Sequence, residues 1–174
     1  MRTITLTLLL ALLLSGTNLF AQNEKYGHTL NLGIGVGYYG YYHHAGRTLP
    51  VIDLNYEFDV ARNFTLAPFV SLYSYREDEK HYRETIIPVG VKGTYYFDQA
   101  LNAGSDWDFY LGGSLGFAIK TSTWDDGYSG ETYYQDVSPL YLNFHLGTEY
   151  HLSNKVGLFL DLSTGVSTIG LAIH

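Results

Sequence analysis

The sequence lacks cysteine, and after the N-terminus it lacks any long apolar run. Without cysteine, a disulfide framework and attachment to a membrane through a lipidated cysteine are excluded, and a metal site would have to use histidine and carboxylate ligands. Beyond residues 6–14, no segment approaches the length of a helical membrane span. If this chain crosses a membrane, only a closed β-barrel can satisfy its backbone polar groups there.

Basic residues are also scarce. Ten lysines and arginines stand against 17 aspartates and glutamates, and the formal net charge is −7. No basic cluster is present, and nucleic acid is therefore not expected as a partner.

The first residues have the pattern of a targeting segment. Arg2 is followed by an apolar run over residues 6–14, and the small residue Ala21 precedes Gln22. This pattern predicts a secretory signal peptide at residues 1–21 and one barrel domain at residues 22–174. A permanent N-terminal membrane anchor is the alternative, but the apolar run is short for that role.

The chain is organised around strands, and residues 140–152 show this most clearly. One parity of this stretch is apolar except for Thr148, while the other carries Tyr141, Asn143, His145, Gly147, Glu149 and His151. Strict alternation indicates a strand with one apolar and one polar face. Because the polar face holds ionisable groups, it does not suit the dry core of a soluble sandwich.

Similar alternation recurs along the chain. It predicts eight strands, at residues 30–39, 52–59, 64–73, 87–97, 109–120, 140–152, 158–163 and 169–173. Residues 76–84 and 121–136 are expected to be loops, and residues 98–106 a turn. An even number of successive hairpins, with mostly alternating short and long connections, predicts an all-β, eight-stranded antiparallel up-and-down transmembrane β-barrel. A soluble lipocalin-like barrel, with its apolar parity inward, is the alternative.

Aromatic residues provide a second indication of a membrane barrel. If the first strand runs outward from the periplasm, outward-facing aromatics gather at the periplasmic rim, namely Phe58, Phe64, Tyr95, Phe97, Phe109 and Tyr150. Tyr38 would lie at the outer rim. Aromatic girdles at the two interfaces are typical of outer-membrane barrels.

Three segments resemble a known family. They are Ile-Pro-Val-Gly-Val-Lys-Gly-Thr-Tyr-Tyr-Phe at 87–97, Tyr-Leu-Gly-Gly-Ser-Leu-Gly-Phe at 110–117 and Gly-Thr-Glu-Tyr at 147–150. The chain resembles the eight-stranded outer-membrane β-barrels of the OmpA/OmpX type. The resemblance implies a Gram-negative outer membrane, insertion by the barrel-assembly machinery, and neither catalytic residues nor a cofactor. We also expect contact with outer-membrane lipids and lipopolysaccharide, and a monomer. One departure is the ending Ala172-Ile173-His174, where such barrels usually carry an aromatic residue.

The inward parity predicts an interior network of charged groups, formed by Asp53, Glu57, Lys92, His145, Glu149 and Asp161. An eight-stranded barrel is filled by side chains, so these charges must pair or stay hydrated. A structural hydrogen-bonded plug is the favoured interpretation. A narrow, porin-like path for ions or small solutes is the alternative.

A short motif raises the possibility of an enzyme. His151-Leu152-Ser153-Asn154 resembles the His-x-Ser-Asn element of the outer-membrane lipid A deacylases, with Glu149 or Asp161 as a possible acid. The motif falls at the expected periplasmic turn, far from the outer leaflet that holds this substrate. We therefore predict no catalytic residue, and a lipid A-modifying acyl hydrolase is the least favoured function.

The longest expected connection combines aromatic and acidic residues. They are Trp124, Asp125, Asp126, Tyr128, Tyr133 and Tyr134, and they suit recognition of a ligand or partner. Capping of the barrel mouth is the alternative. The pair His43 and His44 is not assigned as a metal site, because adjacent strand residues point oppositely. We predict a non-enzymatic integral outer-membrane protein, structural or interacting through its extracellular loops.

Overall fold

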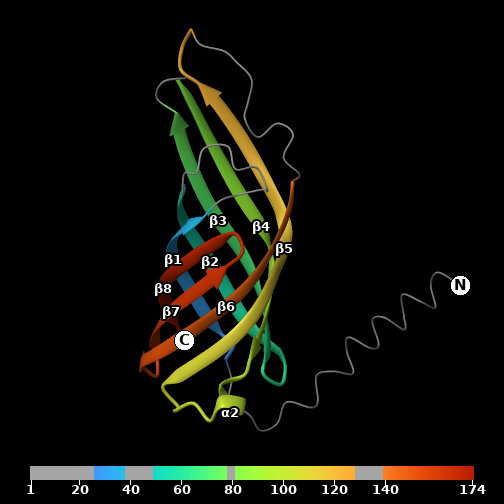
Figure 1. Cartoon of the computed structure of the whole chain (residues 1–174), viewed down its shortest axis with the longest axis vertical. Coiled ribbons are helices and arrows are strands. Elements are labelled where there is room, and N and C mark those ends of the chain that lie inside the picture. The colour runs from blue at the N-terminus through green and yellow to red at the C-terminus, as the bar shows by residue number, and fades with distance from the viewer. Residues whose placement is uncertain (1–25, 38–48, 78–80, 128–138) are drawn as a thin grey trace, which may run out of the picture.

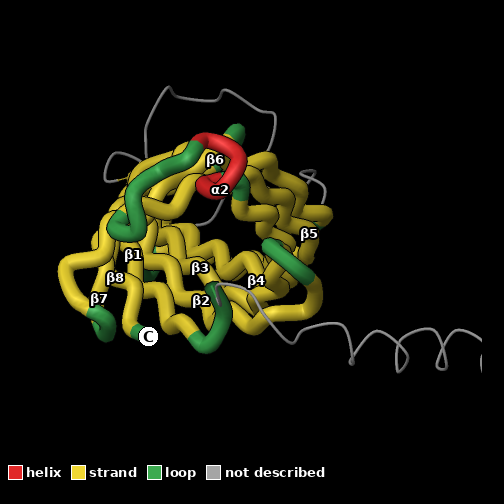
Figure 2. Tube along the Cα trace, turned by 90° about the horizontal axis from the view of Figure 1, so that it is seen from below, coloured by secondary structure: helices red, strands yellow, loops and turns green. Residues whose placement is uncertain are grey.

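The computed structural model describes residues 26–37, 49–77, 81–127 and 139–174. Eight strands close into one antiparallel barrel (Figures 1 and 2). They are β1 (Thr29–Gly37), β2 (Leu49–Ala61), β3 (Phe64–Glu77), β4 (Tyr82–Tyr96), β5 (Trp107–Trp124), β6 (Leu140–Ser153), β7 (Val156–Ser163) and β8 (Val166–Ile173). The predicted fold class is confirmed. Within the described ranges, no helix is long and apolar enough to cross a membrane.

Neighbouring strands in the barrel are neighbours in the sequence. The exception is the seam, where β1 pairs with β8 from Leu30 opposite Ile173 to Gly37 opposite Val166. This pairing gives both edge strands a partner, and closure of this kind removes the exposed edges of a sheet.

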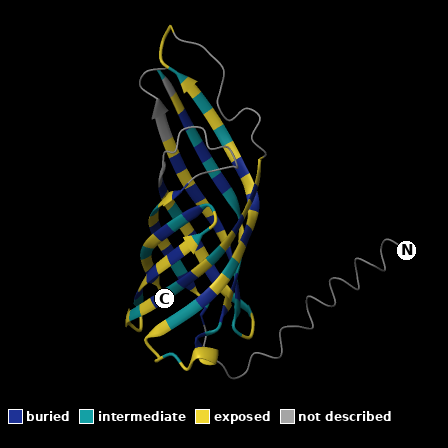
Figure 3. Cartoon of the chain, viewed as in Figure 1, coloured by how far each residue is buried: buried dark blue, intermediate teal, exposed yellow. Residues whose placement is uncertain are grey.

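The two faces of the strands differ as the alternation predicts (Figure 3). In β6, the Leu142 side chain is 58% exposed, whereas its neighbour Tyr141 is 6% exposed. Large apolar residues cover the outside of all eight strands in the same way. A soluble barrel would bury these residues and expose the charged parity, so the lipocalin-like alternative is wrong.

The barrel has two unlike ends (Figure 1). The turn end carries the short hairpin turns at residues 62–63 and 154–155, the short helix α2 (Asp98–Leu101) and His174. Helix α2 lies within residues 98–106, where only a turn was expected. Asn63 and Asn102 adopt left-handed conformations here, with φ of 56° and 49°. Asparagine tolerates that region better than most residues, which permits the tight reversals.

At the opposite loop end, β3, β4 and β5 rise well above the other strands (Figure 1). The pairing of β4 with β5 continues to Tyr82 opposite Trp124, and that of β3 with β4 to Glu77 opposite Tyr82. The prediction of loops at residues 76–84 and 121–136 is therefore wrong where these strands continue. Their polar sequence resembles a loop, but backbone pairing, which polar residues also make, sets the length of the strands.

Aromatic side chains gather on the outside at the turn end. The Trp107 ring lies 4.8 Å from the Tyr150 ring and 6.0 Å from the Phe109 ring, measured between centroids. Phe97 packs 6.4 Å from Phe109. This is the rim at which the sequence places its aromatic girdle, with Trp107 as an addition. The outer-rim residue Tyr38 lies outside the described residues.

Candidate functional site

The barrel interior is arranged in layers along its axis. A layer of mostly apolar side chains lies toward the loop end and comprises Val51, Phe69, Tyr73, Ile86, Ala118, Tyr141 and Val166. Toward the turn end, Tyr26, Tyr96 and Tyr110 form a second layer, in which the first two rings stack at 4.0 Å. The charged side chains that the sequence places inside lie largely between these layers.

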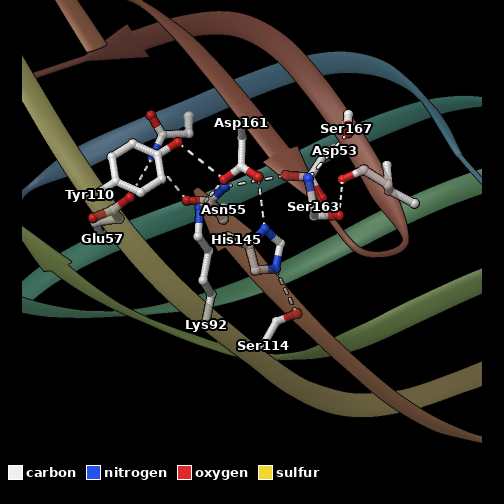
Figure 4. Close-up of polar contacts among 12 residues, drawn as sticks. Asp53, Asn55, Glu57, Lys92, Tyr110, Ser114, His145, Asp161, Ser163 and Ser167 are labelled. Carbon is white, nitrogen blue, oxygen red and sulfur yellow. Dashed lines mark hydrogen bonds and ion pairs between the residues drawn. The ribbon is translucent and has the colours of Figure 1, made fainter. Parts of the chain in front are cut away.

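Asp161 is the centre of one half of this network (Figure 4). Its carboxylate forms an ion pair with the Lys92 ammonium and accepts a hydrogen bond from the Tyr110 hydroxyl at 3.1 Å. The other carboxylate oxygen lies 2.7 Å from Nδ1 of His145, whose Nε2 lies 2.9 Å from the Ser114 hydroxyl. Because Asp161 is only 3% exposed, these contacts replace the water that the carboxylate loses.

Glu57 is the centre of the other half, and it is also 3% exposed. It accepts hydrogen bonds from the hydroxyls of Tyr96 and Thr65, each at 2.7 Å. The amide of Asn31 bridges from Glu57 to Asn55, at 3.0 and 2.9 Å.

Asp53 continues this half of the network toward the loop end. Its carboxylate accepts hydrogen bonds from the Asn55 amide at 3.2 Å and from the Ser71 hydroxyl at 2.5 Å. These two halves contain five of the predicted members, namely Asp53, Glu57, Lys92, His145 and Asp161, and both halves line one interior cavity.

Lys92 is the cation of this region. The Lys92 residue is 7% exposed, and its ammonium also lies 4.7 Å from the centre of the Tyr110 ring, which suits a cation–π contact. The side chains leave a cavity of about 40 Å³ between them, lined by charged, polar and aromatic residues. That volume has room for a small number of water molecules.

Glu149, the sixth predicted member, is held differently. It lines the same cavity, but its carboxylate contacts groups at the turn end. Oε1 of Glu149 lies 2.8 Å from Nε2 of His174 and 4.0 Å from Nδ1 of His151. Nε2 of His151 lies 2.8 Å from a carboxylate oxygen of Asp108. We call Asp108, Glu149, His151 and His174 the rim cluster.

Sequence reasoning did not group the rim cluster, although a signal for it is present. All four residues continue the inward parity of their strands to the turn end: Asp108 on β5, Glu149 and His151 on β6, and His174 directly after β8. Parity alone does not show that three separate strands bring these groups to the same height of the barrel. That information comes from the register of the strands.

The motif that resembles a deacylase does not form a nucleophile–base pair. Both ring nitrogens of His151 face carboxylates, Asp108 on one side and Glu149 on the other. The Ser153 hydroxyl instead accepts a hydrogen bond from the backbone N–H of Lys155 at 3.3 Å. A serine nucleophile needs the histidine within hydrogen-bonding distance, and this arrangement does not supply it.

The residues suggested for recognition are only partly described. Trp124 ends β5, and Asp125 follows it, with its carboxylate 3.4 Å from Nδ1 of His81. Asp126 is exposed. The other three, Tyr128, Tyr133 and Tyr134, lie outside the described residues, as do His43 and His44.

The sequence matches no protein-family model and no curated protein. Solved structures do match. Neisserial surface protein A is 14% identical over 83% of this chain and 94% of its own, with a TM-score of 0.58. The attachment invasion locus protein Ail of Yersinia pestis is 8% identical over 84% and 98%, with a TM-score of 0.51. A designed transmembrane β-barrel is 14% identical over 87% and 98%, also with a TM-score of 0.51.

These identities are too low to transfer a role, but the agreement extends over nearly the whole of each matched chain. Together with the closed eight-stranded topology, it shows that this chain has the fold of the eight-stranded outer-membrane β-barrels of the OmpA/OmpX type.

Proposed function

We propose that this chain is a non-enzymatic integral protein of the bacterial outer membrane, in which a closed barrel anchors an extracellular β3–β4–β5 extension and its loops. The observation that carries the proposal is the interior. In the middle of the barrel, Asp161 pairs with Lys92 and the other inward carboxylates accept hydrogen bonds, and side-chain layers lie on both sides of them. A barrel closed in this way is suited to anchor and display rather than to conduct.

The outer surface supports a location in a membrane. Exposed leucine, isoleucine, valine and phenylalanine surround the barrel, and aromatic rings gather at its turn end. Exposing so much apolar surface to water is unfavourable, whereas contact with lipid tails is favourable. The turn end is then periplasmic and the loop end extracellular, because outer-membrane barrels have short periplasmic turns.

The β3–β4–β5 extension supports a role outside the cell. These strands continue past the height at which β7 and β8 turn, so the part of the molecule beyond the barrel is built as a paired sheet. Trp124, Asp125 and Asp126 lie at the end of this sheet. A rigid sheet holds recognition residues in place better than a loop does.

A narrow ion path is the second candidate function, because the charged residues Lys92, Asp53 and Asp161 line the cavity. Planar-bilayer recording separates the two. The anchor predicts no steady conductance from the purified protein in high salt. Reproducible unitary cation currents, absent from a heat-denatured sample, would place conduction first.

The orientation of the barrel in the membrane can be tested by placing a charge at two different depths of the bilayer. Leu146 lies on the outward face of β6, between the outer part of the strand and the girdle residue Tyr150. Leu146→Arg should destabilise the barrel in lipid vesicles by about 2–4 kcal/mol, because it places a charge near the middle of the bilayer.

Leu152→Arg on the same face is the matched control. This residue lies beyond Tyr150, at the interface, and the expected cost is about 0–1 kcal/mol. Equal effects of the two substitutions in urea titrations would contradict the membrane orientation.

A further inference from the structure

We propose that the turn end of the barrel holds one divalent transition-metal ion, with Glu149, His151 and His174 as its protein ligands and zinc as the best-suited metal. One potential ligand atom from each residue lies within 4.8 Å of the others. The site is separate from the anchor and display function, and it does not depend on that proposal.

The hydrogen bonds of His174 leave a ring nitrogen directed at Glu149. The Thr29 hydroxyl donates to the backbone carbonyl of Tyr26 at 2.9 Å. Its single proton is therefore used, and at 2.9 Å from Nδ1 of His174 it must accept a hydrogen bond. Nδ1 carries the proton, and Nε2 of a neutral ring then presents a lone pair to the Glu149 carboxylate 2.8 Å away. Two acceptors at that distance require a positive charge between them, a proton or a metal ion.

His151 repeats this arrangement with its nitrogens exchanged. Its Nε2 lies 2.8 Å from the carboxylate of Asp108, to which it donates. The Nδ1 lone pair is thereby directed toward Oε1 of Glu149, at 4.0 Å. This distance is too long for a hydrogen bond. Two ligand atoms of a tetrahedral ion with bonds of about 2.0–2.2 Å lie about 3.3–3.6 Å apart, so a small rotation of the His151 ring brings both atoms within reach of one ion.

Each histidine therefore has one nitrogen held by a partner and the other turned toward the same carboxylate. Metal-binding histidines are commonly oriented in this way, because the bond from the second nitrogen fixes the tautomer and the direction of the ring. Asp108 and Thr29 supply those orienting bonds. The two rings stack, with centroids 5.1 Å apart.

The charge balance also favours a cation. Among the described residues, the ion-pair partners of Glu149 are His151 and His174, and neither is a lysine or an arginine. Asp108 adds a second carboxylate to the cluster. The Glu149 side chain is only 8% exposed, so water compensates little of its charge.

The packing allows the carboxylate to reach its position. A Cβ added at Gly157 would lie 2.0 Å from Oε1 of Glu149, so the glycine leaves space that the carboxylate uses. The side chains of His151 and His174 are 25% and 20% exposed, which leaves access from the turn end. Two imidazoles and one carboxylate suit zinc and leave a fourth position for water.

The test uses the full-length protein without a histidine tag, purified in detergent and freed of metal with a chelator. Zinc is titrated against a chromophoric competitor, and the expected result is one ion per barrel. Glu149→Gln and His174→Ala should each weaken binding by about tenfold or more, because each changes a direct ligand and changes to orienting partners alone cost about 10–100-fold. Asp108→Asn should weaken binding about 10–100-fold while leaving all three ligands in place.

His28→Asn is the matched control, since it removes a histidine from the same end but outside the cluster. Asparagine tolerates the positive φ of 68° at this position, and zinc affinity should not change. A second measurement needs no variant, so it still tests the proposal if a variant fails to fold. In the native protein, zinc should shift the imidazole nitrogen resonances of His151 and His174 and leave those of His28 unchanged. Less than one bound ion per native barrel, or equal affinity in all folded variants, would overturn the proposal.

Discussion

Two buried carboxylates in this barrel, Asp161 and Glu149, have different environments. Both point inward, both are at most 6% exposed, and both contact a histidine within 2.8 Å. Asp161 also has the Lys92 ammonium, whereas the ion-pair partners described for Glu149 are histidines. The charge of Asp161 is thus neutralised by a lysine of the chain itself. The charge of Glu149, at the turn end, is left to a proton or metal ion from solution.

Position along the axis explains the difference. Asp161 lies between two layers of side chains, and a charge there needs a permanent partner because solvent exchange is restricted. Glu149 lies at the turn end beside two partly exposed histidines, where protons or ions from solution can enter. Three tests address this contrast.

The largest effect is expected for Lys92→Met. It removes the ammonium and leaves Asp161 buried with hydrogen bonds but without its counter-charge. Breaking a buried pair in this way costs about 3–5 kcal/mol. Urea unfolding in lipid vesicles, followed by the fluorescence of Trp107 and Trp124, measures the loss.

Lys155→Met is the control for this substitution, because Lys155 is exposed in a turn. It should have no measurable effect. If Lys92→Met were equally harmless, the interior charges would be solvated by water, and the ion-path hypothesis would gain support.

The second test combines Lys92→Met with Asp161→Leu. Removing both partners leaves no uncompensated charge, so the double substitution should cost less than the sum of the two single ones. The expected coupling is about 1–3 kcal/mol, as for other residues in direct contact. A coupling near zero in the same urea titrations would mean that the ion pair contributes little.

The smallest effect is expected for Glu149→Gln. The amide N–H of the new side chain can donate to Nε2 of His174, and Thr29 still holds His174, so the cost should be about 1 kcal/mol. A loss as large as that of Lys92→Met would show that the rim cluster is as much a part of the internal support as the Asp161 network.

Strand parity predicted much of the fold and part of the interior. The period of two places Asp53, Glu57, Lys92, His145 and Asp161 inward, and the structure joins them in one region. Parity is informative because placing polar side chains against lipid, or an apolar belt against water, costs free energy. The inward residues of a strand in such a barrel can therefore be predicted from that strand alone, without knowledge of its neighbours.

Height along the barrel axis was not predicted in the same way. Glu149 shares its parity with His145, but the registers of β5 with β6, β6 with β7 and β7 with β8 bring it to the rim cluster instead of the Asp161 network. The extents of β3, β4 and β5 also escaped prediction, because their outer segments pair through backbone groups that every sequence carries. Both features depend on contacts between strands that a pattern within one strand does not contain.

The seam between β1 and β8 has a consequence for the order of assembly. Thr29 and His174 bond across it although 145 residues separate them in the chain. Forming a contact between such distant segments costs the most loop-closure entropy, so this contact is expected to form late, after the sequential hairpins. Interactions that form after the transition state change the rate of unfolding more than that of folding. His174 therefore lies where it can lengthen the lifetime of the closed barrel, with little influence on how quickly the barrel forms.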